Sequence, residues 1–415
     1  MSSICEKCIE DVHLRKTLEF WLDEGDCCEC GAVRTQVVTF EKLGSLAADI
    51  IEEHFTIGEQ EPYFGGADDD KVQYEQAGQP LTDIVQDVLG QFFKAHDAIV
   101  EATIDAGNVG IWPPDGDEPF FDYMYNYVES TKYTDYLAKW NEASESLKHR
   151  SRFFNRQIQA FFTDVFQDFA EMKVYNLSTK KIDTAIATLD AGAVLYRARR
   201  CMELGASDEM FREPLRNVGP PPRSRAQAGR MNAEGVVACY ASLDRETAVA
   251  EIRPTIGSYA VSIGMTLTRP VRILDFSILQ RAQAKSLSYF QPDFKDQFGR
   301  FKFLRNLANL ISQPVIPGNE REYLITQCMC EWLSYATVPE LSGVSFSSTQ
   351  HAGGTNIVLF PGEETEPGAS ATAFPISYVE ESITLSYLKS VKYQIIELDT
   401  YTSKDGSVFV FRDHE

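Results

Sequence analysis

The sequence predicts an α+β protein whose N-terminal part is helical and whose C-terminal part mixes strands with a few helices. Between Phe40 and about Ala185, apolar residues recur at steps of three and four, the period of a helix with one buried face. After residue 190, short runs rich in β-branched residues alternate with turn clusters. Charge changes at the same place, because residues 1–180 hold 34 acidic and 15 basic side chains, a balance of −19 within a net charge of −22.

We expect three parts from this pattern. Residues 1–39 form a cysteine-rich segment, residues 40–185 a helical domain and residues 186–415 a mixed α+β domain. A chain of 415 residues that is 44% hydrophobic and 24% charged lies in the range of globular proteins and can bury more than one core.

Composition also indicates where the protein acts and what it contacts. No run reaches the ~18 apolar residues of a membrane span, and residues 1–20 lack the basic-then-apolar order of a secretory signal. We therefore expect a cytoplasmic protein that does not insert into a membrane. The acidic N-terminal half would repel a phosphate backbone, so nucleic acid is not an expected partner. The sequence leaves a homo-oligomer open.

Five of the nine cysteines lie within the first thirty residues. Cys5-x-x-Cys8 and Cys27-x-x-Cys30 are two knuckles that can supply four thiolates to one tetrahedral ion. Four protein thiolates leave no place for water or substrate, so we expect a structural zinc that holds together a segment too short for a core of its own. Cys28 is a spare that could replace Cys27 in a shifted register, and unligated thiols are the alternative.

Two regions of the N-terminal half carry little chemistry. The aromatic stretch at residues 146–172 is expected to form a helical core rather than a cofactor site. The expected core residues are Phe153, Phe154, Ile158, Phe161, Phe162, Phe166 and Phe169. The run Asp68–Asp70 lacks the spaced ligands and closing Glu of a calcium loop, so we expect solvated charge there.

In the C-terminal half, short apolar runs bounded by turn residues predict strands. Apolar residues that recur at steps of three and four predict helices. The expected strands are Ala193–Tyr196, Val236–Tyr240, Tyr259–Met265, Val271–Asp275, Ile357–Leu359 and Lys392–Glu397. The expected helices are Arg245–Arg253, 300–312 and 320–336.

Several common enzyme motifs are missing from the sequence. There is no GxxxxGK[ST] phosphate loop, no GxGxxG dinucleotide turn, no HExxH and no GxSxG. These absences argue against P-loop, Rossmann, zinc-peptidase and serine-hydrolase sites, although they do not exclude an enzyme.

A set of spaced polar residues remains in the C-terminal half. Arg197 lies in Leu195-Tyr196-Arg197, on or just after a strand, and Arg230 lies in Gly229-Arg230-Met231-Asn232. Tyr240 follows ten residues after Arg230, and Glu251 eleven residues after Tyr240. Far downstream come Ser347 and Ser348, and then Asn356 before an apolar strand.

This pattern resembles the RES family, which is named for an Arg, a Glu and a Ser. In that family a GRWN-x-x-G segment precedes a strand ending in Tyr-x-Ser, a helix with the Glu follows, and a late segment resembles GI-x-Y-P-S. The resemblance covers most of residues 190–360. Met231 stands where Trp is usual and Phe346 where Tyr is usual. Ser347 stands where Pro is usual, so either Ser347 or Ser348 is the family serine.

The resemblance implies a fold and an activity. RES proteins resemble ADP-ribosyltransferase-type folds and degrade NAD, often as toxins held in check by an inhibitory antitoxin or other regulatory protein. The N-terminal zinc-plus-helices arrangement looks like the HEPN-like extension of some larger RES proteins. We therefore expect an N-terminal zinc-stapled helical domain followed by a RES domain, with NAD as substrate.

The chemistry of NAD cleavage fits these residue types. Nicotinamide leaves as a neutral molecule and needs no general acid, so one carboxylate, Glu251, is enough to stabilise the oxocarbenium-like ribose. Arg230 and Arg197 suit the pyrophosphate because a guanidinium offers paired donors. Tyr240 offers a flat ring to nicotinamide, and Ser348 a hydroxyl to its amide or the ribose. Ser347, Asn232 and Asn356 are further substrate-binding candidates.

Three hypotheses follow. The first is an NAD glycohydrolase or phosphorylase, with water or phosphate as acceptor. The second is an ADP-ribosyltransferase that modifies a macromolecule with the same site. The third is a non-enzymatic, zinc-containing interaction protein. Residues that act at bond cleavage cannot separate the first two, because the first step is shared.

Overall fold

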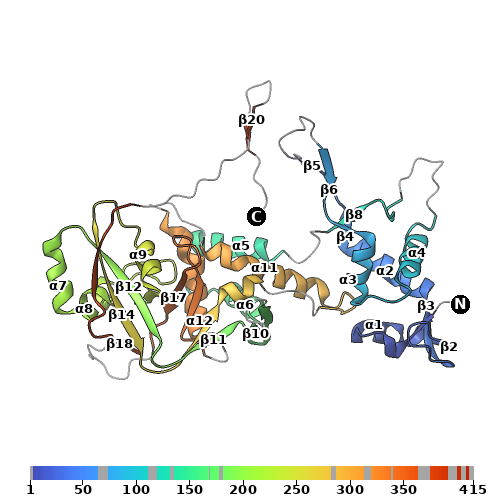
Figure 1. The fold of residues 1–415 in the computed structure, drawn as a ribbon, viewed down its shortest axis with the longest axis horizontal. Helices are drawn as coiled ribbons and strands as arrows, with labels where there is room; N and C mark the ends of the chain where they lie inside the picture. The colour runs from blue at the N-terminus through green and yellow to red at the C-terminus, as the bar shows by residue number, and fades with distance from the viewer. Residues whose placement is uncertain are drawn as a thin grey trace. The chain divides into compact units, whose positions relative to one another are not determined.

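The computed structural model describes residues 3–63, 73–110, 119–130, 135–167, 169–176, 181–281, 287–312, 319–337, 340–362, 374–390, 400–402 and 408–410 (Figure 1). The chain divides into two compact units, which are described separately below. The first comprises Met1–Gln167, Val174–Ile182 and Leu279–Leu307, and the second Asp168–Lys173, Asp183–Ile278 and Ala308–Glu415. The boundaries expected after residues 39 and 185 stay predictions.

The first unit begins with a small sheet. Strand β1 (Ser3–Cys5) pairs with β3 (Thr35–Thr39), which pairs on its other side with β2 (Asp23–Gly25). Helix α1 (Val12–Leu18) begins at Asp11, whose carboxylate accepts hydrogen bonds from the amides of His13 and Leu14 and so satisfies free donors of the first turn. The segment contributes Ile4, Leu14 and Leu18, all fully buried, to a core shared with the following helices.

Three helices follow the small sheet: α2 (Phe40–His54), α3 (Leu81–Leu89) and α4 (His96–Gly107). Thr39 caps α2 by accepting from the amide of Lys42. Between α2 and α3 lie short strands that the sequence did not predict: β4 (Phe55–Ile57), β5 (Gln60–Tyr63), β6 (Gln73–Gln76) and β7 (Gln79–Pro80). A further short strand, β8 (Asn126–Glu129), follows α4. Strands of two to four residues are too short for an alternating pattern to show. The run Asp68–Asp70 lies outside the described residues.

Helices α5 (Tyr136–His149), α6 (Arg156–Val165) and the first part of α11 (Phe294–Ser312) pack through aromatic rings. Rings of Tyr136, Trp140 and Phe161 all lie 5.7 to 6.2 Å from the ring of Phe303. The expected core is confirmed for Ile158, Phe161, Phe162, Phe166 and Phe169, which are buried.

The prediction was wrong for Phe153 and Phe154, which are 78% and 100% exposed. They lie in the turn between α5 and α6, ahead of Asn155, whose side chain caps α6 by accepting from the amide of Ile158. Because Asn155 starts a separate helix, the residues just before it do not continue the buried face of either helix.

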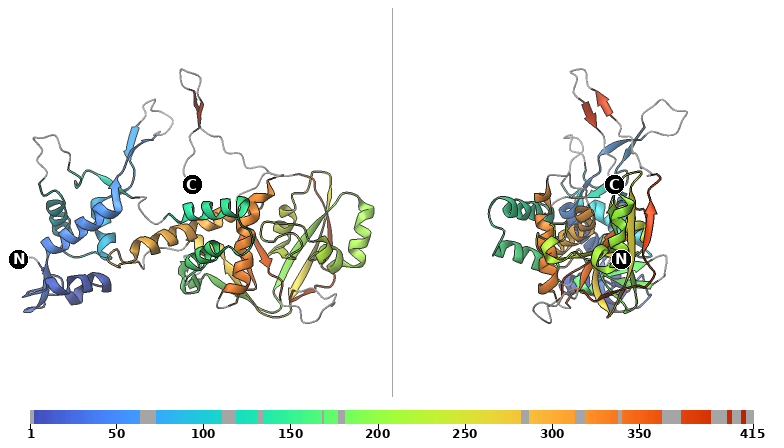
Figure 2. Two further views of the ribbon diagram at one scale, coloured as in Figure 1. Left: turned by 180° about the vertical axis from the view of Figure 1, so that it is seen from behind. Right: turned by 90° about the vertical axis from the view of Figure 1, so that its left-hand side faces the viewer.

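The second unit is built on a mixed sheet with nine strands among the described residues. The order is β11-β15-β16-β17-β13-β12-β14-β18, with β19 also paired to β14. These strands are β11 (Ile186–Leu189), β12 (Val194–Cys201), β13 (Cys239–Ser242), β14 (Tyr259–Leu267), β15 (Val271–Asp275), β16 (Gly343–Ser347), β17 (Thr355–Leu359), β18 (Ile376–Tyr378) and β19 (Thr384–Tyr387). Figures 1 and 2 show strand β14 beside strand β18, which comes much later in the chain.

The sheet is divided near its middle. Strands β12 and β14 pair along eight residues, whereas β12 and β13 share the single pair Tyr196↔Ser242. Helix α9 (Arg245–Glu251) contacts β12, β13, β14 and β17. Buried side chains of the other face, including Leu195, Cys239 and Val261, form a core with Val218.

The remaining elements of the C-terminal half are short helices, one longer helix and one pair of strands. They are η5 (Leu204–Ala206), α7 (Ser207–Arg212), α8 (Pro214–Val218), η6 (Arg223–Arg225), α10 (Phe276–Arg281), η7 (Glu320–Tyr323), α12 (Leu324–Ala336), β20 (Thr400–Thr402) and β21 (Val408–Val410). Short pieces of the first half are η1 (Glu6–Cys8), η2 (Glu19–Trp21), η4 (Phe169–Glu171), β9 (Lys173–Asn176) and β10 (Lys181–Thr184). A helix is found at each of the three expected places, but α9 ends at Glu251 and residues 320–323 form the 3-10 helix η7 before α12. The expected strand at 392–397 lies outside the described residues.

The mixed α+β class is confirmed. Within the described part of the chain, no helix has the length and apolar character to cross a bilayer. The likeness to ADP-ribosyltransferase folds and the HEPN-like character of the helical part stay predictions.

Candidate functional site

The four cysteines of the two knuckles lie together. The Sγ atoms of Cys5, Cys8, Cys27 and Cys30 are all within 4.8 Å of one another. Cys5 Sγ is 3.6 Å from that of Cys8 and 3.7 Å from that of Cys30, while Cys8 and Cys27 are 4.0 Å apart. Cys28 is exposed and lies outside the cluster, so Cys27 supplies the third thiol.

These separations fit a tetrahedral metal. A Zn–S bond of about 2.3 Å places the sulfurs of a tetrahedral site about 3.8 Å apart. Burial acts to raise the pKa of Cys27, but backbone N–H donors of Cys30, Cys5 and Glu29 lower it to about 6. The Cys5 amide lies 3.2 Å from Cys27 Sγ, so the backbone favours the thiolate at Cys27, whereas burial raises the pKa of Cys5 and of Cys8.

In the second unit, the last residue of α9 is held by the sheet. Glu251 Oε1 accepts from Ser348 Oγ at 2.6 Å and from Asn356 Nδ2 at 2.7 Å. Ser242 Oγ donates to Asn356 Oδ1 at 3.0 Å. Among the described residues both hydrogen bonds to Glu251 go to Oε1, so Oε2 keeps its lone pairs for another group.

The structure distinguishes the two serines of the late segment. Ser347 ends β16, pairs with Thr355 and is exposed. Ser348 is half-buried and its hydroxyl both donates to Glu251 and accepts from the amides of Gln350 and His351, each at 3.1 Å. The chain therefore brings Ser348, and not Ser347, to the carboxylate.

Tyr240 anchors the turn that carries Arg230. Its hydroxyl donates to Asn232 Oδ1 at 2.8 Å and accepts from the amide of Met231 at 2.9 Å. A Cβ on Gly229 would lie 2.6 Å from that hydroxyl, so only glycine admits the ring this close. Burial raises the pKa of Tyr240 well above its ordinary value, which keeps the phenol neutral.

Asn232 is occupied within the same turn. It is 6% exposed, and its Nδ2 donates to the carbonyls of Gln227, Ala233 and Val236. These contacts favour a role in shaping the turn, and its predicted contact with substrate stays a prediction.

Arg230 is half-buried and contacts Ile311 and Tyr323. Its Nη1 donates to the carbonyl of Ile311 at 2.5 Å, and its guanidinium carbon lies 5.2 Å from the ring centroid of Tyr323. Burial lowers the pKa of Arg230, and the charges that act on it include Tyr240, Arg253 and Glu251. Among the described residues Arg230 makes no hydrogen bond or ion pair with Glu251, and of the charges named that of Glu251 acts on it least.

Arg197 is not part of this group. Side chains alternate along β12, and the neighbouring Tyr196 lies on the side of α9, where its ring is 5.1 Å from the guanidinium of Arg245. Arg197 lies on the opposite face and donates to the carbonyls of Val218, Gly219 and Tyr240. Its bond to the Tyr240 carbonyl therefore links β12 to β13, two strands that share only one residue pair. Its predicted contact with pyrophosphate stays a prediction, and its geometry favours a structural role.

Two residues near the site were not singled out from the sequence. Arg253 follows α9 with a φ of 45°, a left-handed conformation that is uncommon for a non-glycine residue, and it is exposed. His351 lies in the loop that carries Ser348 and contacts Thr247 of α9. Neither could be found from spacing, because neither belongs to a repeated pattern.

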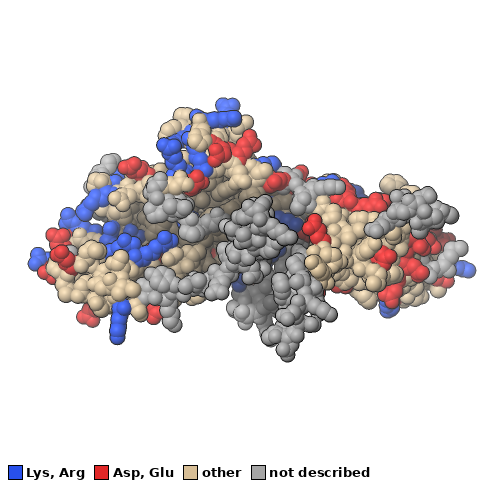
Figure 3. Space-filling model, turned by 90° about the horizontal axis from the view of Figure 1, so that it is seen from above, with Lys and Arg blue, Asp and Glu red and all other residues tan. Residues whose placement is uncertain are grey.

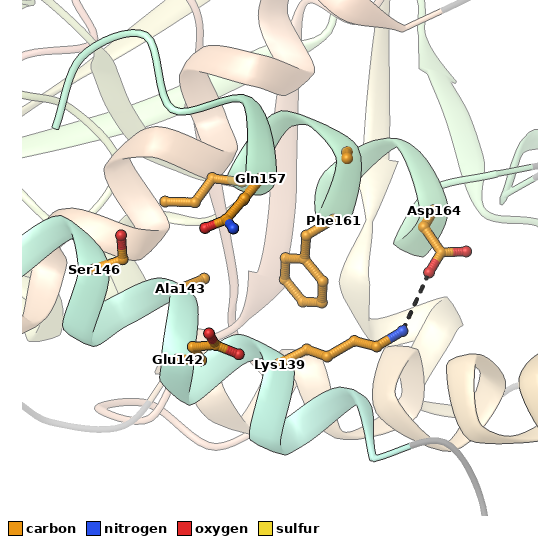
Figure 4. A pocket seen from close by; sticks show the side chains of 9 residues that line it. Lys139, Glu142, Ala143, Ser146, Gln157, Phe161 and Asp164 are labelled. Atoms are coloured by element: carbon orange, nitrogen blue, oxygen red, sulfur yellow. Dashed lines mark ion pairs between the residues drawn. The ribbon is translucent and has the colours of Figure 1, made fainter. Parts of the chain in front are cut away.

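A groove of about 470 Å³ lies elsewhere, between α5 and α6 of the first unit. Figure 4 shows Phe161 and Ala143 in its wall and the ion pair between Lys139 and Asp164, 3.7 Å long, at its end. None of the predicted site residues lines it. Figure 3 shows carboxylates gathered over the first unit, and arginines and lysines more frequent over the second.

One protein-family model matches part of the chain. Residues 194–379 match the model of the RES domain family. The matched segment contains Arg230, Tyr240, Glu251 and Ser348, and the family is associated with NAD-related toxin activity. Searches of curated proteins and of solved structures found no significant match.

Proposed function

We propose, from the premise that residues 194–379 form a RES domain, that this protein cleaves the bond between nicotinamide and ribose in NAD. The observation that supports the proposal best is the state of Glu251. Its Oε1 is fixed by Ser348 and Asn356, and its Oε2 has no hydrogen-bond partner among the described residues.

The proposed reaction begins with heterolysis of the N-glycosidic bond. The bonding electron pair goes to the nicotinamide nitrogen, which loses its positive charge, and the ribose becomes an oxocarbenium-like cation. Glu251 Oε2 stabilises that cation because a fixed carboxylate pays little reorganisation when charge develops beside it. No proton is needed by the leaving group, so one carboxylate, Glu251, is enough for this step.

Arg230 is the proposed anchor for the pyrophosphate. One edge of its guanidinium is fixed on the carbonyl of Ile311, which orients the remaining N–H donors. Tyr240 contributes by holding the Gly229–Asn232 turn, so that its hydroxyl acts on Arg230 through the backbone.

The cation is then captured by a small acceptor. Water adds a hydroxyl to the ribose carbon and releases a proton, whereas inorganic phosphate adds through an oxygen. We favour a small acceptor over a nucleic acid because the balance of −19 on residues 1–180 would repel a phosphate backbone.

The experiment is to incubate purified full-length protein with NAD, with and without phosphate, and identify products by mass spectrometry. We expect free nicotinamide and an ADP-ribose product that carries phosphate if phosphate is the acceptor. Transfer of labelled ADP-ribose to protein or nucleic acid would instead support the transferase hypothesis. No turnover and no stabilisation of the fold by NAD would overturn the enzymatic proposal.

Two further proposals accompany this one. The cysteine cluster holds structural zinc, because its donor set is four thiolates at tetrahedral separations. In the cytoplasm, an inhibitory protein restrains the activity, because unrestrained loss of NAD would harm the cell. Co-purification of a partner that suppresses nicotinamide release would support this second proposal.

A further inference from the structure

The loop between β16 and β17 is attached to α9 at a second point besides Ser348. His351 Nδ1 lies 2.9 Å from Thr247 Oγ1, near the start of the helix. Thr247 in turn bonds the helix cap, because its amide donates to Asp244 Oδ1 at 2.7 Å and its hydroxyl to Asp244 Oδ2 at 2.6 Å. A Cβ on Gly354 would lie 2.1 Å from Thr247 Oγ1, so the loop approaches the helix as closely as glycine allows.

The hydrogen bonds determine which nitrogen of His351 carries a proton. A hydroxyl has one hydrogen, and Thr247 gives it to the carboxylate of Asp244. Thr247 Oγ1 can therefore only accept from His351, so Nδ1 of His351 is the donor. The other nitrogen, Nε2, faces Glu246 Oε2 at 3.7 Å.

The two attachments lie on one face of α9. Thr247 and Glu251 are four residues apart, which places them one above the other on a helix. Their loop partners, His351 and Ser348, are three residues apart, and the amide of His351 donates to Ser348 Oγ. A fixed His351 therefore limits where the Ser348 hydroxyl can lie relative to Glu251.

We propose that His351 is a positioning residue that holds Ser348 against Glu251 through its Nδ1–H bond to Thr247. Its consequence for turnover rests on the proposed function, whereas its effect on the loop rests on geometry alone. It is a role for a residue that does not itself reach the substrate.

Two substitutions test the bond and control each other. His351→Asn places an amide N–H near the position of Nδ1, and His351→Gln places one near the position of Nε2, so the two variants keep a similar polarity. In hydrogen exchange on full-length protein without NAD, we expect loop residues 348–354 to be protected in the wild type and in His351→Asn. In His351→Gln the same amides should exchange about tenfold faster, the effect of losing one hydrogen bond.

Turnover gives the second readout. Nicotinamide release should fall about tenfold in His351→Gln and stay within about threefold of the wild type in His351→Asn. Equal exchange rates in the two variants would overturn the inference, whatever the wild type does with NAD. Failure of the wild type to release nicotinamide would instead overturn the proposed function, while slower exchange in His351→Asn than in His351→Gln would still support the positioning role.

Discussion

Ser242 and Asn356 face each other across β13 and β17, and the serine hydroxyl donates to the amide oxygen at 3.0 Å. Because the oxygen of Asn356 is used in this way, its Nδ2 is turned toward Glu251 Oε1, 2.7 Å away. The register of the sheet thus sets the direction of an amide, and the amide sets the orientation of the carboxylate at the end of α9.

The first prediction concerns Glu251. Glu251→Gln keeps the size of the side chain but removes the negative charge, so nicotinamide release should fall at least about 100-fold. The matched control is Glu209→Gln, an exposed glutamate on α7, which should leave the rate unchanged. Nicotinamide is quantified by chromatography after incubation with NAD. A rate in Glu251→Gln within twofold of the control would remove this carboxylate from the mechanism.

The second prediction concerns the side-chain amide of Asn356, which donates to Glu251. Asn356→Asp replaces the donor to Glu251 with a second carboxylate, so repulsion should displace Glu251 and reduce turnover by about 100-fold. Ser242→Ala removes one neutral hydrogen bond, so turnover should fall only about fivefold. The same assay checks both, with thermal melts to verify folding. If Asn356→Asp were as active as Ser242→Ala, the donor role of this amide would be wrong.

These contacts show what the sequence could and could not reveal. The resemblance to the RES family singled out Arg230, Tyr240, Glu251 and a late serine, because their intervals follow the family's pattern, and a family model matches the same segment. The same reasoning could not separate Ser347 from Ser348, since that choice depends on where β16 ends. It could not find His351 either, because its partner Thr247 is 104 residues away.

The face of a strand is equally hidden from a motif. Arg197 lies on β12 next to Tyr196, but successive side chains point to opposite sides, and only the packing of α9 and α8 shows which side is which. The α+β class was predictable from periodicity, whereas the short strands β4 to β8 were not, because a strand of two to four residues carries no readable period.

The third prediction separates binding from cleavage. Arg230→Lys keeps the charge but loses the planar pair of donors and the fixed bond to the Ile311 carbonyl. We expect kcat/KM for NAD to fall about 10- to 100-fold, mainly through a higher KM, which corresponds to the ~1.5–3 kcal/mol of a hydrogen bond to a charged group. Arg212→Lys, an exposed arginine at the end of α7, is the control. An unchanged KM in Arg230→Lys would contradict a role in anchoring the pyrophosphate.

The fourth prediction concerns the metal. Metal analysis of purified protein should find about one zinc per chain, since one closed site of four thiolates holds one ion. Cys30→Ser should lose the ion and loosen residues 3–39, whereas Cys28→Ser, whose thiol lies outside the cluster, should keep it. Zinc retained in Cys30→Ser at the wild-type level would refute the ligand set.

The last prediction is independent of any activity. Phe154 is fully exposed, so its ring contributes no burial, yet its φ of 54° places it in the left-handed region between α5 and α6. That conformation costs an L-residue about 1–2 kcal/mol, and glycine avoids it at an entropic cost of about 0.5–1 kcal/mol in the unfolded chain. Phe154→Gly should therefore raise the free energy of unfolding by roughly 0.5–1 kcal/mol, measured by urea titration of the full chain. Phe153→Ala, the exposed neighbour without a positive φ, should change it by less than about 0.5 kcal/mol. A loss of stability in Phe154→Gly would mean that the ring is held by contacts that outweigh the backbone strain.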